Sequence, residues 1–592
     1  MRSRADTARG ARFSVWAPLA RSVEIVFDDA RYALLEGEGG RWQIELDATR
    51  AAAPYRYSID GAAPLPDPRS RWQGDGVHGR SGGAHAGIPP PRRGGFRPKP
   101  LREALIYEMH VGTFTPQGTY ATACERLGHL AELGATYVEI MPLATFPGRH
   151  GWGYDGVDWF APHPAYGTPG ELAALVEACH RHGLGVLLDV VYNHLGPDGN
   201  YLARFGPYFT DRVRTAWGDA MNYDGPDSDE VRSFVIDNAR MWLADYGFDG
   251  LRLDAVHAIY GFEAVHVLED LASAVKTLAA ELDRPLLLIA ESDLNNPRLV
   301  QAPEQGGYGL DAHWEDDFHH SLHRFFTGET SGYYADFSGL PDVAKALTAG
   351  YVYQGRHSAF RRRRHGRPPH HVEPQQLVVC AQNHDQVGNR AFGERLSMLV
   401  DGPKLKAIAA LTLLSPFVPL LFQGEEWGAK TPFLYFTDHS DPELGRLVAE
   451  GRRREFSGFG WAGDIPNPQA ADTFLRSKLD WRELGVPWHA DLLHWHRRLI
   501  RIRRAKLESG AGQPPGAEVR FDAAAAWLTV LHQGVLGVFN FAAHRQRVPV
   551  PDGAWELVLA SAEPQPAWSN EVAAGATRIF VDARLAEILL RI

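Results

Sequence analysis

The sequence has few cysteines for its length. Its 592 residues include three, Cys124, Cys179 and Cys380, which lie far apart in the chain. They are too few and too scattered for a disulfide framework or for a zinc site built from closely spaced cysteine pairs. We therefore expect a protein of a reducing compartment, with the cytoplasm as its location.

Long apolar runs are missing as well. No segment approaches the ~18 consecutive apolar residues of a membrane-spanning helix. The N-terminal residues MRSRADTARGARF carry charge without an apolar stretch behind them. The sequence thus predicts neither a membrane segment nor a secretory signal peptide, and we expect no membrane partner.

Basic residues are not in excess. The formal net charge is −11, whereas binding to nucleic acid needs a basic surface. One dense basic run, residues 361–367, lies in a stretch that contains prolines, and we interpret it as a solvated loop. We expect no nucleic acid partner.

The chain is too long for one hydrophobic core, because single cores stop growing near ~250–300 residues. Residues 12–59 form short runs of alternating apolar and polar residues, which are typical of a small antiparallel sandwich. Residues 81–100 are rich in glycine, proline and arginine and have no period. We predict an N-terminal, carbohydrate-binding-like β-sandwich at residues 1–88 and a linker at residues 89–100.

After residue 100, apolar runs alternate with amphipathic helical segments, a pattern typical of parallel strands joined by helices. We predict strands at residues 105–111, 136–141, 185–191, 250–254, 286–291, 309–314, 376–382 and 418–423. Helices are expected at residues 119–132, 169–182, 230–246, 262–281, 402–414 and 488–506. The predicted fold class is therefore α/β. It comprises a (β/α)8 TIM barrel at residues 101–507, with a short insertion at about 195–228, and a C-terminal antiparallel β domain at residues 508–592.

Carboxylates follow or end three of the predicted strands. In a TIM barrel the active site lies at the C-terminal ends of the strands, where Asp254, Glu291 and Asp385 are placed. Each alone is more typical of a helix cap or a loop hydrogen bond. Together, with histidines and an arginine beside them, they predict an active site. Carboxylates that converge repel one another, and such a costly arrangement is typical of a site whose reaction requires it.

Cleavage of a glycosidic bond requires such a group of carboxylates. One protonated carboxyl donates its proton to the leaving oxygen, and one carboxylate meets the positive charge that develops on the sugar carbon. A further carboxylate near the same carbon stabilises the transition state. The pattern of the strand ends therefore favours a glycoside hydrolase.

Four segments at these strand ends resemble, in order and spacing, the signature regions of the α-amylase family: DVVYNH (189–194), GLRLDAVH (250–257), AES (290–292) and QNHD (382–385). The resemblance covers nearly the whole chain, since family members often carry a β domain on each side of the barrel. It implies a hydrolase that retains the anomeric configuration. In it Asp254 is the nucleophile, Glu291 the general acid and base, and Asp385 the carboxylate that stabilises the transition state.

The same resemblance implies which residues bind the sugar. Arg252 orients the nucleophile, His194 and His384 bind sugar hydroxyls in the cleaved subsite, and Tyr154 of GWGYD is a stacking platform there.

Asp189 and Asn193 are expected to hold the loop and Arg252 in place. Residues 195–228 contain aspartates without a coordination pattern, so we expect neither a metal nor a cofactor.

Longer strings are similar to those of family members that release trehalose from maltooligosyl trehalose: GLRLDAVHAI (250–259), IAESDLNNP (289–297), AQNHDQVGNR (381–390) and FQGEEWGAKTPFLYFTDH (422–439). This similarity implies hydrolysis of the α-1,4 bond next to the terminal trehalose. It also implies a functional link to a maltooligosyl trehalose synthase, which would supply the substrate. His257 stands where many amylases place a lysine, and His257 and Gln386 are candidates for recognising trehalose.

Two alternatives remain open at this point. A glycogen branching or debranching enzyme can share the sandwich and the carboxylates but transfers chains or cuts α-1,6 bonds of a related α-glucan. A non-catalytic, amylase-like carbohydrate-binding protein is the other, although such relatives lose one or more of the carboxylates, and all three are present here.

Overall fold

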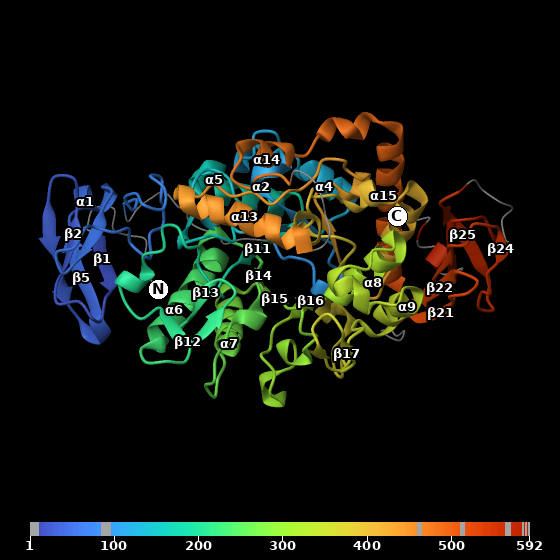
Figure 1. The fold of residues 1–592 in the computed structure, drawn as a ribbon, viewed down its shortest axis with the longest axis horizontal. Helices are drawn as coiled ribbons and strands as arrows, with labels where there is room; N and C mark the ends of the chain where they lie inside the picture. Colours follow the sequence, from blue (N-terminus) through green and yellow to red (C-terminus); the bar gives the residue numbers. More distant parts are fainter. Residues whose placement is uncertain are drawn as a thin grey trace.

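The computed structural model describes residues 11–83, 96–458, 465–509, 516–562 and 570–582, together with residues 585, 586 and 589. The molecule is elongated, with antiparallel sheets at its two ends and a barrel surrounded by helices between them (Figure 1). No helix within the described ranges is long and apolar enough to cross a membrane.

Eight parallel strands form a closed barrel in the order β11-β14-β15-β16-β19-β20-β7-β8. Their bounds are β7 Ile106–Met109, β8 Tyr137–Ile140, β11 Gly185–Val190, β14 Gly250–Leu253, β15 Leu287–Glu291, β16 Ala312–Trp314, β19 Leu377–Cys380 and β20 Val418–Phe422. The strands are almost entirely buried, because helices cover the barrel outside and side chains fill it inside. Each lies within a predicted run, so the predicted TIM barrel is confirmed.

Helices surround the barrel at α2 Val111–Phe114, α3 Tyr120–Cys124, α4 Leu127–Leu133, α5 Pro169–Arg181, α6 Ser228–Arg240, α7 Val267–Leu282, α8 Asp316–Thr327, α9 Leu340–Ala349, α11 Leu396–Leu399, α12 Gly402–Leu413 and α15 Pro487–Ser509. Helix α5 illustrates why they begin where they do. The Thr168 hydroxyl accepts from the Glu171 N–H, the Glu171 carboxylate accepts from the Thr168 N–H, and a proline follows the cap.

Two predicted helices differ from the structure. The helix expected at 119–132 is divided into α3 and α4, and the helix expected at 262–281 begins only at Val267. The ring of His266 accepts from the backbone N–H of Leu268 and so caps α7, which leaves residues 260–265 outside the helix.

Several elements beyond the predicted pattern lie on the barrel loops. Helices α13 (Pro442–Gly458) and α14 (Ala471–Arg476) follow β20, while the predicted insertion contains a hairpin of β12 (Phe209–Thr215) and β13 (Gly218–Met221). Two further short hairpins pair β9 Ala144–Thr145 with β10 Asp158–Pro162, and β17 His357–Ser358 with β18 Arg363–Arg364.

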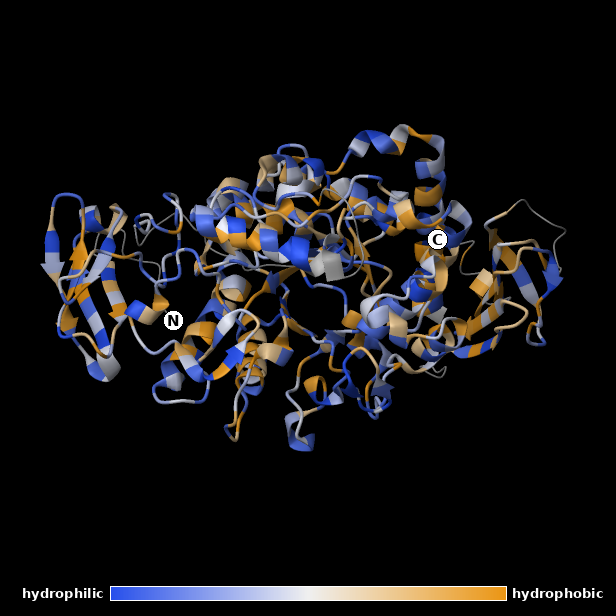
Figure 2. Ribbon diagram, in the orientation of Figure 1, coloured by the Kyte–Doolittle hydropathy of each residue, from blue (hydrophilic) through white to orange (hydrophobic). Residues whose placement is uncertain are grey.

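The N-terminal region forms two three-stranded antiparallel sheets and one short helix, α1 Ala48–Ala52. One sheet joins β1 Ala11–Trp16, β5 Arg41–Leu46 and β4 Leu35–Glu36, and the other joins β3 Arg31–Ala33, β2 Val23–Val26 and β6 Arg56–Ile59. Hydrophobic and hydrophilic residues alternate along these strands (Figure 2), and the buried rings of Phe13, Tyr55 and Tyr57 lie in the core. Residues 89–95 of the predicted linker lie outside the described residues, and the predicted domain limits stay predictions.

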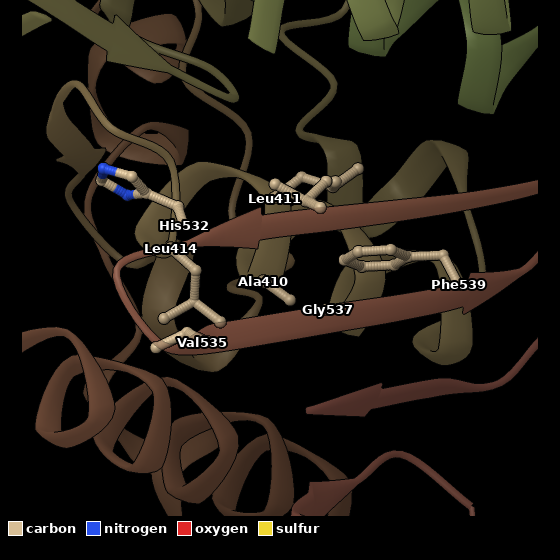
Figure 3. A pocket seen from close by; sticks show the side chains of 8 residues that line it. Ala410, Leu411, Leu414, His532, Val535, Gly537 and Phe539 are labelled. Atoms are coloured by element: carbon tan, nitrogen blue, oxygen red, sulfur yellow. The ribbon is translucent and has the colours of Figure 1, made fainter. Parts of the chain in front are cut away.

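The C-terminal sheet is antiparallel, in the order β21 Glu518–Asp522, β22 Trp527–His532, β23 Val535–Asn540, β27 Thr577–Asp582 and β25 Trp555–Ala560, with a separate pair of β24 Gln546–Arg547 and β26 Glu571–Val572. It meets the barrel at α12, where Leu411 and Leu414 face Val535 and Phe539 across a narrow cavity (Figure 3). The lining of that cavity is mainly apolar. A sugar needs polar partners, so the cavity serves as a packing interface between the two domains.

Candidate active site

The structure brings the three predicted carboxylates to one end of the barrel. Asp254 directly follows β14, Glu291 ends β15, and Asp385 lies in the short helix α10 (His384–Gly388) after β19. Strands β14 and β15 are neighbours, and only β16 separates β15 from β19. Because all eight strands are parallel, these residues share the C-terminal end of the barrel, where TIM-barrel active sites lie.

Arg252 is the charged centre beneath these carboxylates. Its guanidinium donates to both oxygens of Asp189 at 2.9 Å and to Asp254 Oδ1 at 2.9 Å, and it lies 3.7 Å from Glu291 Oε2. The side chain is fully buried and packs 4.2 Å from the centre of the Trp314 ring. Burial alone would lower the pKa of Arg252, but its acidic neighbours, Asp189 above all, raise it. Arg252 therefore stays charged and holds Asp254 in a fixed orientation.

Asp254 and Glu291 are restrained by further donors. The Asn193 amide donates to Asp254 Oδ2 at 2.7 Å, and the backbone N–H of Ala255 donates to Glu291 Oε2 at 2.6 Å. Ala255 has a φ of +40°, a left-handed conformation that is rare for a residue other than glycine. Such strain persists where the surroundings enforce it, and here it turns the N–H toward Glu291.

Glu291 lies in an environment that favours its protonated form. Burial raises the pKa of this carboxyl well above its usual range, and the carboxylates of Asp254, Asp316 and Asp385 raise it further, although Arg252 opposes them. Its side chain is 14% exposed, so it remains accessible from the end of the barrel. A carboxyl in this state is suited to donate a proton at neutral pH.

His384 and Tyr154 form a second hydrogen-bonded group. Glu108 accepts from the backbone N–H of His384 at 3.1 Å and from its ring Nδ1, while the Nε2 lies 2.7 Å from the Tyr154 hydroxyl. That hydroxyl donates to Asp189 Oδ2 at 2.6 Å. Burial would lower the pKa of His384, but Glu108 and Asp385 outweigh it and raise the pKa to about 9. His384 is therefore an imidazolium that donates from both nitrogens.

The ring of Tyr154 stacks on His384, with 5.2 Å between centroids and an interplanar angle of 23°. His194, the other predicted histidine, stacks in the same manner on Trp217 at 4.5 Å and 9°. Trp217 lies in the turn of the β12–β13 hairpin and is 49% exposed. The hairpin in the predicted insertion thus covers His194 with an aromatic ring.

The remaining predicted residues, His257 and Gln386, are less closely tied to the carboxylates. His257 lies in the turn after β14, and its buried Nδ1 has no hydrogen-bond partner among the described residues. Gln386 lies in α10 next to Asp385, and its side-chain oxygen accepts from the Tyr333 hydroxyl at 3.3 Å. Both therefore border the group without joining its central network.

The interpretation of residues 361–367 as a solvated loop is wrong for Arg361 and for His365, which is 3% exposed and whose ring Nε2 lies 2.7 Å from the backbone oxygen of Asp293. Arg361 donates to Asp293 at 2.8 Å, and its side chain is only 12% exposed. Asp293 lies two residues after Glu291, so this ion pair forms close to that carboxyl along the chain. The positive charge of Arg361 offsets the cost of partly burying the Asp293 carboxylate.

Sequence reasoning missed Glu108, Asp316 and Asn389. Glu108 lies in the first predicted strand, and Asp316 directly follows the sixth strand in the run Trp-Glu-Asp-Asp. A polar residue within or just after each barrel strand was a signal that would have found both. Burial raises the pKa of Asp316 to about 7, and Asp293 and Asp385 add to the effect. Asn389 lies four residues after Asp385 and donates to its carboxylate at 3.1 Å.

Within the described part of the chain, no group of three or more histidine, cysteine, aspartate or glutamate side chains is arranged to hold a metal ion. The acidic side chains at the end of the barrel are instead matched by Arg252 and His384. The expectation of no metal and no cofactor stays a prediction.

Comparisons with known proteins agree with this geometry. The family profile described as alpha amylase, catalytic domain, matches residues 78–214. The chain is 48% identical to the malto-oligosyltrehalose trehalohydrolase of Rhizobium sp. (strain M-11), over 91% of this chain and 92% of that protein. It is also 48% identical to the malto-oligosyltrehalose trehalohydrolase of Arthrobacter ramosus, over 98% of this chain and 99% of that protein.

Its fold is similar to a crystal structure of a candidate alpha amylase from Salmonella typhimurium. The TM-score is 0.89 at 35% identity, and the match covers 97% of this chain and 98% of that chain. The agreement in sequence extends over both β domains as well as the barrel. The chain therefore belongs to the malto-oligosyltrehalose trehalohydrolase family, among the glycoside hydrolases of the α-amylase type.

Proposed function

We propose that this protein hydrolyses the α-1,4-glucosidic bond next to the terminal trehalose of a maltooligosyl trehalose, with retention of configuration, and releases free trehalose. The observation that carries the proposal is the convergence of Asp254, Glu291 and Asp385 around a buried Arg252 in a chain of this family. The similarity to trehalohydrolases supports the choice of substrate, and the geometry of the carboxylates supports the reaction type.

In the first step Asp254 attacks the anomeric carbon of the glucose next to the trehalose. Glu291 donates its proton to the bridging oxygen, the bond between that carbon and oxygen breaks, and trehalose leaves. The glucan chain is then held as an ester of Asp254. Arg252 and Asn193 fix the attacking carboxylate, since each donates to one of its oxygens.

In the second step the Glu291 carboxylate removes a proton from a water molecule, which attacks the same carbon. The ester bond breaks, and Asp254 and protonated Glu291 are restored. The shortened maltooligosaccharide leaves with an α-anomeric reducing end. Asp385 binds hydroxyls of the reacting sugar ring more strongly as positive charge develops, and so lowers the barrier.

The histidines and aromatic rings bind the sugar. In this proposal His194 and the cationic His384 bind ring hydroxyls. The Nε2 of His194 accepts from one hydroxyl, since its Nδ1 lies against the Asn193 amide oxygen, and the Nε2–H of His384 is shared between Tyr154 and another hydroxyl. The Tyr154 face packs against the apolar face of the pyranose.

His257 and Gln386, which border the carboxylates, are the residues proposed to contact the trehalose unit. A synthase that caps maltodextrins with trehalose would supply the substrate, and the three free cysteines suit a reducing compartment such as the cytoplasm.

A product profile tests this function. The purified protein is incubated separately with maltopentaosyl trehalose, linear maltodextrin and glycogen, and the released sugars are identified by chromatography. Trehalose as the main product of the capped substrate, with slow cleavage of maltodextrin, supports the proposal. Chain transfer or opening of α-1,6 bonds would instead identify a branching or debranching enzyme, and no turnover at all would identify a carbohydrate-binding protein.

A further inference from the structure

Asp385 is the least enclosed of the three carboxylates. Its side chain is 45% exposed, against 12% for Asp254 and 14% for Glu291. Among the residues that the structure describes, the only hydrogen bond to its carboxylate comes from Asn389, whose Nδ2 donates to Oδ1 at 3.1 Å. The ring of His384 lies farther away, at 3.7 Å. The orientation of Asp385 therefore depends on how Asn389 is held.

Asn389 is held by Arg452, which comes from a different helix. Residue 389 follows α10, whereas Arg452 lies in α13. One guanidinium nitrogen of Arg452 donates to Asn389 Oδ1 at 3.0 Å, and the other donates to the backbone oxygen of Gly388 at 3.0 Å. The same guanidinium lies 4.7 Å from the centre of the Tyr435 ring. These contacts fix Arg452 against the end of α10.

The three side chains form a relay with only one possible direction. A guanidinium can only donate, so Arg452 must engage the oxygen of the Asn389 amide. The amide nitrogen of Asn389 then has to point the other way, toward Asp385. An ionised carboxylate can only accept, so the N–H of Asn389 donates to the Asp385 carboxylate, which needs a donor. Without Arg452, the amide of the exposed Asn389 would be free to rotate in solvent.

Helix α13 is itself anchored at its start. The Asp441 carboxylate accepts from the Glu443 N–H at 2.9 Å, and the preceding Ser440 donates its N–H to Asp198 at 2.6 Å. Asp198 also lies 3.0 Å from the ring Nε2 of His78. Residues near the N-terminal sheets and in the loop after β11 thus hold the beginning of α13. This anchoring places Arg452, about three turns later, at a fixed position.

We propose that Asn389 is a positioning residue for Asp385 and that Arg452 acts through it, so that α13 sets the orientation of the carboxylate that stabilises the transition state. The inference rests on the proposed role of Asp385. Neither residue needs to touch the substrate. Their effect is on kcat more than on KM, because the contact of Asp385 with the sugar strengthens in the transition state.

The test is a double-mutant cycle of Asn389→Ala and Arg452→Ala, with Arg446→Ala as the control. Arg446 lies on the same helix, but its ion pairs within the described part of the chain are with Glu443 and Glu450 alone, whose side chains are 62% and 44% exposed. Asn389→Ala is expected to lower kcat by about tenfold, the size of one hydrogen bond to a charged group. Arg452→Ala is expected to lower it about threefold in the wild type and to have almost no further effect beside Asn389→Ala. Arg446→Ala leaves kcat unchanged.

Asn389 is exposed, so its replacement removes no buried contact and the variant should fold. Additive losses from the two variants, or a kcat of Asn389→Ala within about twofold of the wild type, would overturn the proposal. A crystal structure of Asn389→Ala gives a readout that does not depend on substrate: we expect a rotated or doubled Asp385 carboxylate, and an unmoved, single one contradicts us. If the wild type cleaves only linear maltodextrin, the trehalose specificity fails, but the same cycle is read with that substrate.

Discussion

Replacing Arg252 with methionine removes the single buried cation shared by Asp189 and Asp254. Loss of one partner of a buried ion pair costs about 3–5 kcal/mol, because the remaining carboxylates lose their nearest counter-charge. Methionine retains much of the volume that packs on Trp314. Asp189 still accepts from Tyr154, and Asp254 still accepts from Asn193, so we place the cost at the lower end, about 3 kcal/mol at pH 8.

The cost of this substitution depends on pH in a defined direction. Burial raises the pKa of Asp189 to about 6 even with Arg252 beside it, and loss of the cation raises it further. A folded-state pKa above the unfolded value means that the folded variant holds a proton which the unfolded chain has lost. The free energy of unfolding of the variant is therefore retained at low pH and falls as pH rises. The decrease is up to about 1.4 kcal/mol per pH unit between roughly pH 4 and the raised pKa of Asp189. We expect the smallest deficit near pH 5 and the largest at pH 8.

Urea denaturation followed by tryptophan fluorescence, at pH 5, 6.5 and 8, measures this difference in the free energy of unfolding. The control is Arg240→Met, because Arg240 forms an exposed pair with Glu281 and should cost less than about 1 kcal/mol at every pH. A deficit for Arg252→Met that is the same at all three pH values would refute the reasoning. So would a deficit below about 1 kcal/mol at pH 8.

Three other changes have definite expected results. Glu291→Gln should abolish hydrolysis while substrate binding, measured by calorimetry, stays nearly intact; retained turnover contradicts its role as the acid. Asp316→Asn removes a negative charge that raises the pKa of Glu291, so the alkaline limb of the pH profile of kcat/KM should move to lower pH, and an unmoved limb contradicts the coupling. Glu108→Gln removes the main charge that raises the pKa of His384 to about 9. KM for the capped substrate should then increase between pH 6 and 8 in the variant but not in the wild type, as initial rates would show.

The barrel was predictable because its strands are short, largely apolar runs that contain at most one charged residue each. Strand β11 is buried along its whole length, and such a run bounded by polar residues is distinct in the sequence. The polar residues that follow these runs share one end of a parallel barrel, so the convergence of Asp254, Glu291 and Asp385 could be predicted as well. Their individual roles stay predictions.

Other features arise only from tertiary contacts. Arg361 belongs to a run of four arginines that is typical of a solvated loop, and only its pairing with Asp293 removes it from water. Helix α13 is rich in charged residues and contains few large apolar ones, so its place beside α10 depends on contacts such as Arg452 with Asn389. The partners are 63 positions apart in the sequence, so no local signal of their contact exists.

The central claim is that trehalose is released with retention of the anomeric configuration. Proton NMR on a freshly mixed sample of the protein with maltopentaosyl trehalose tests it most directly. The first spectra, recorded before mutarotation, should show free trehalose and an equal amount of a new maltooligosaccharide reducing end in the α-anomeric form. That result indicates a double displacement at the anomeric carbon, which the account assigns to a covalent intermediate on Asp254 with proton donation by Glu291. A β-anomeric reducing end in the first spectra, or shortening of the chain without trehalose, would contradict the account.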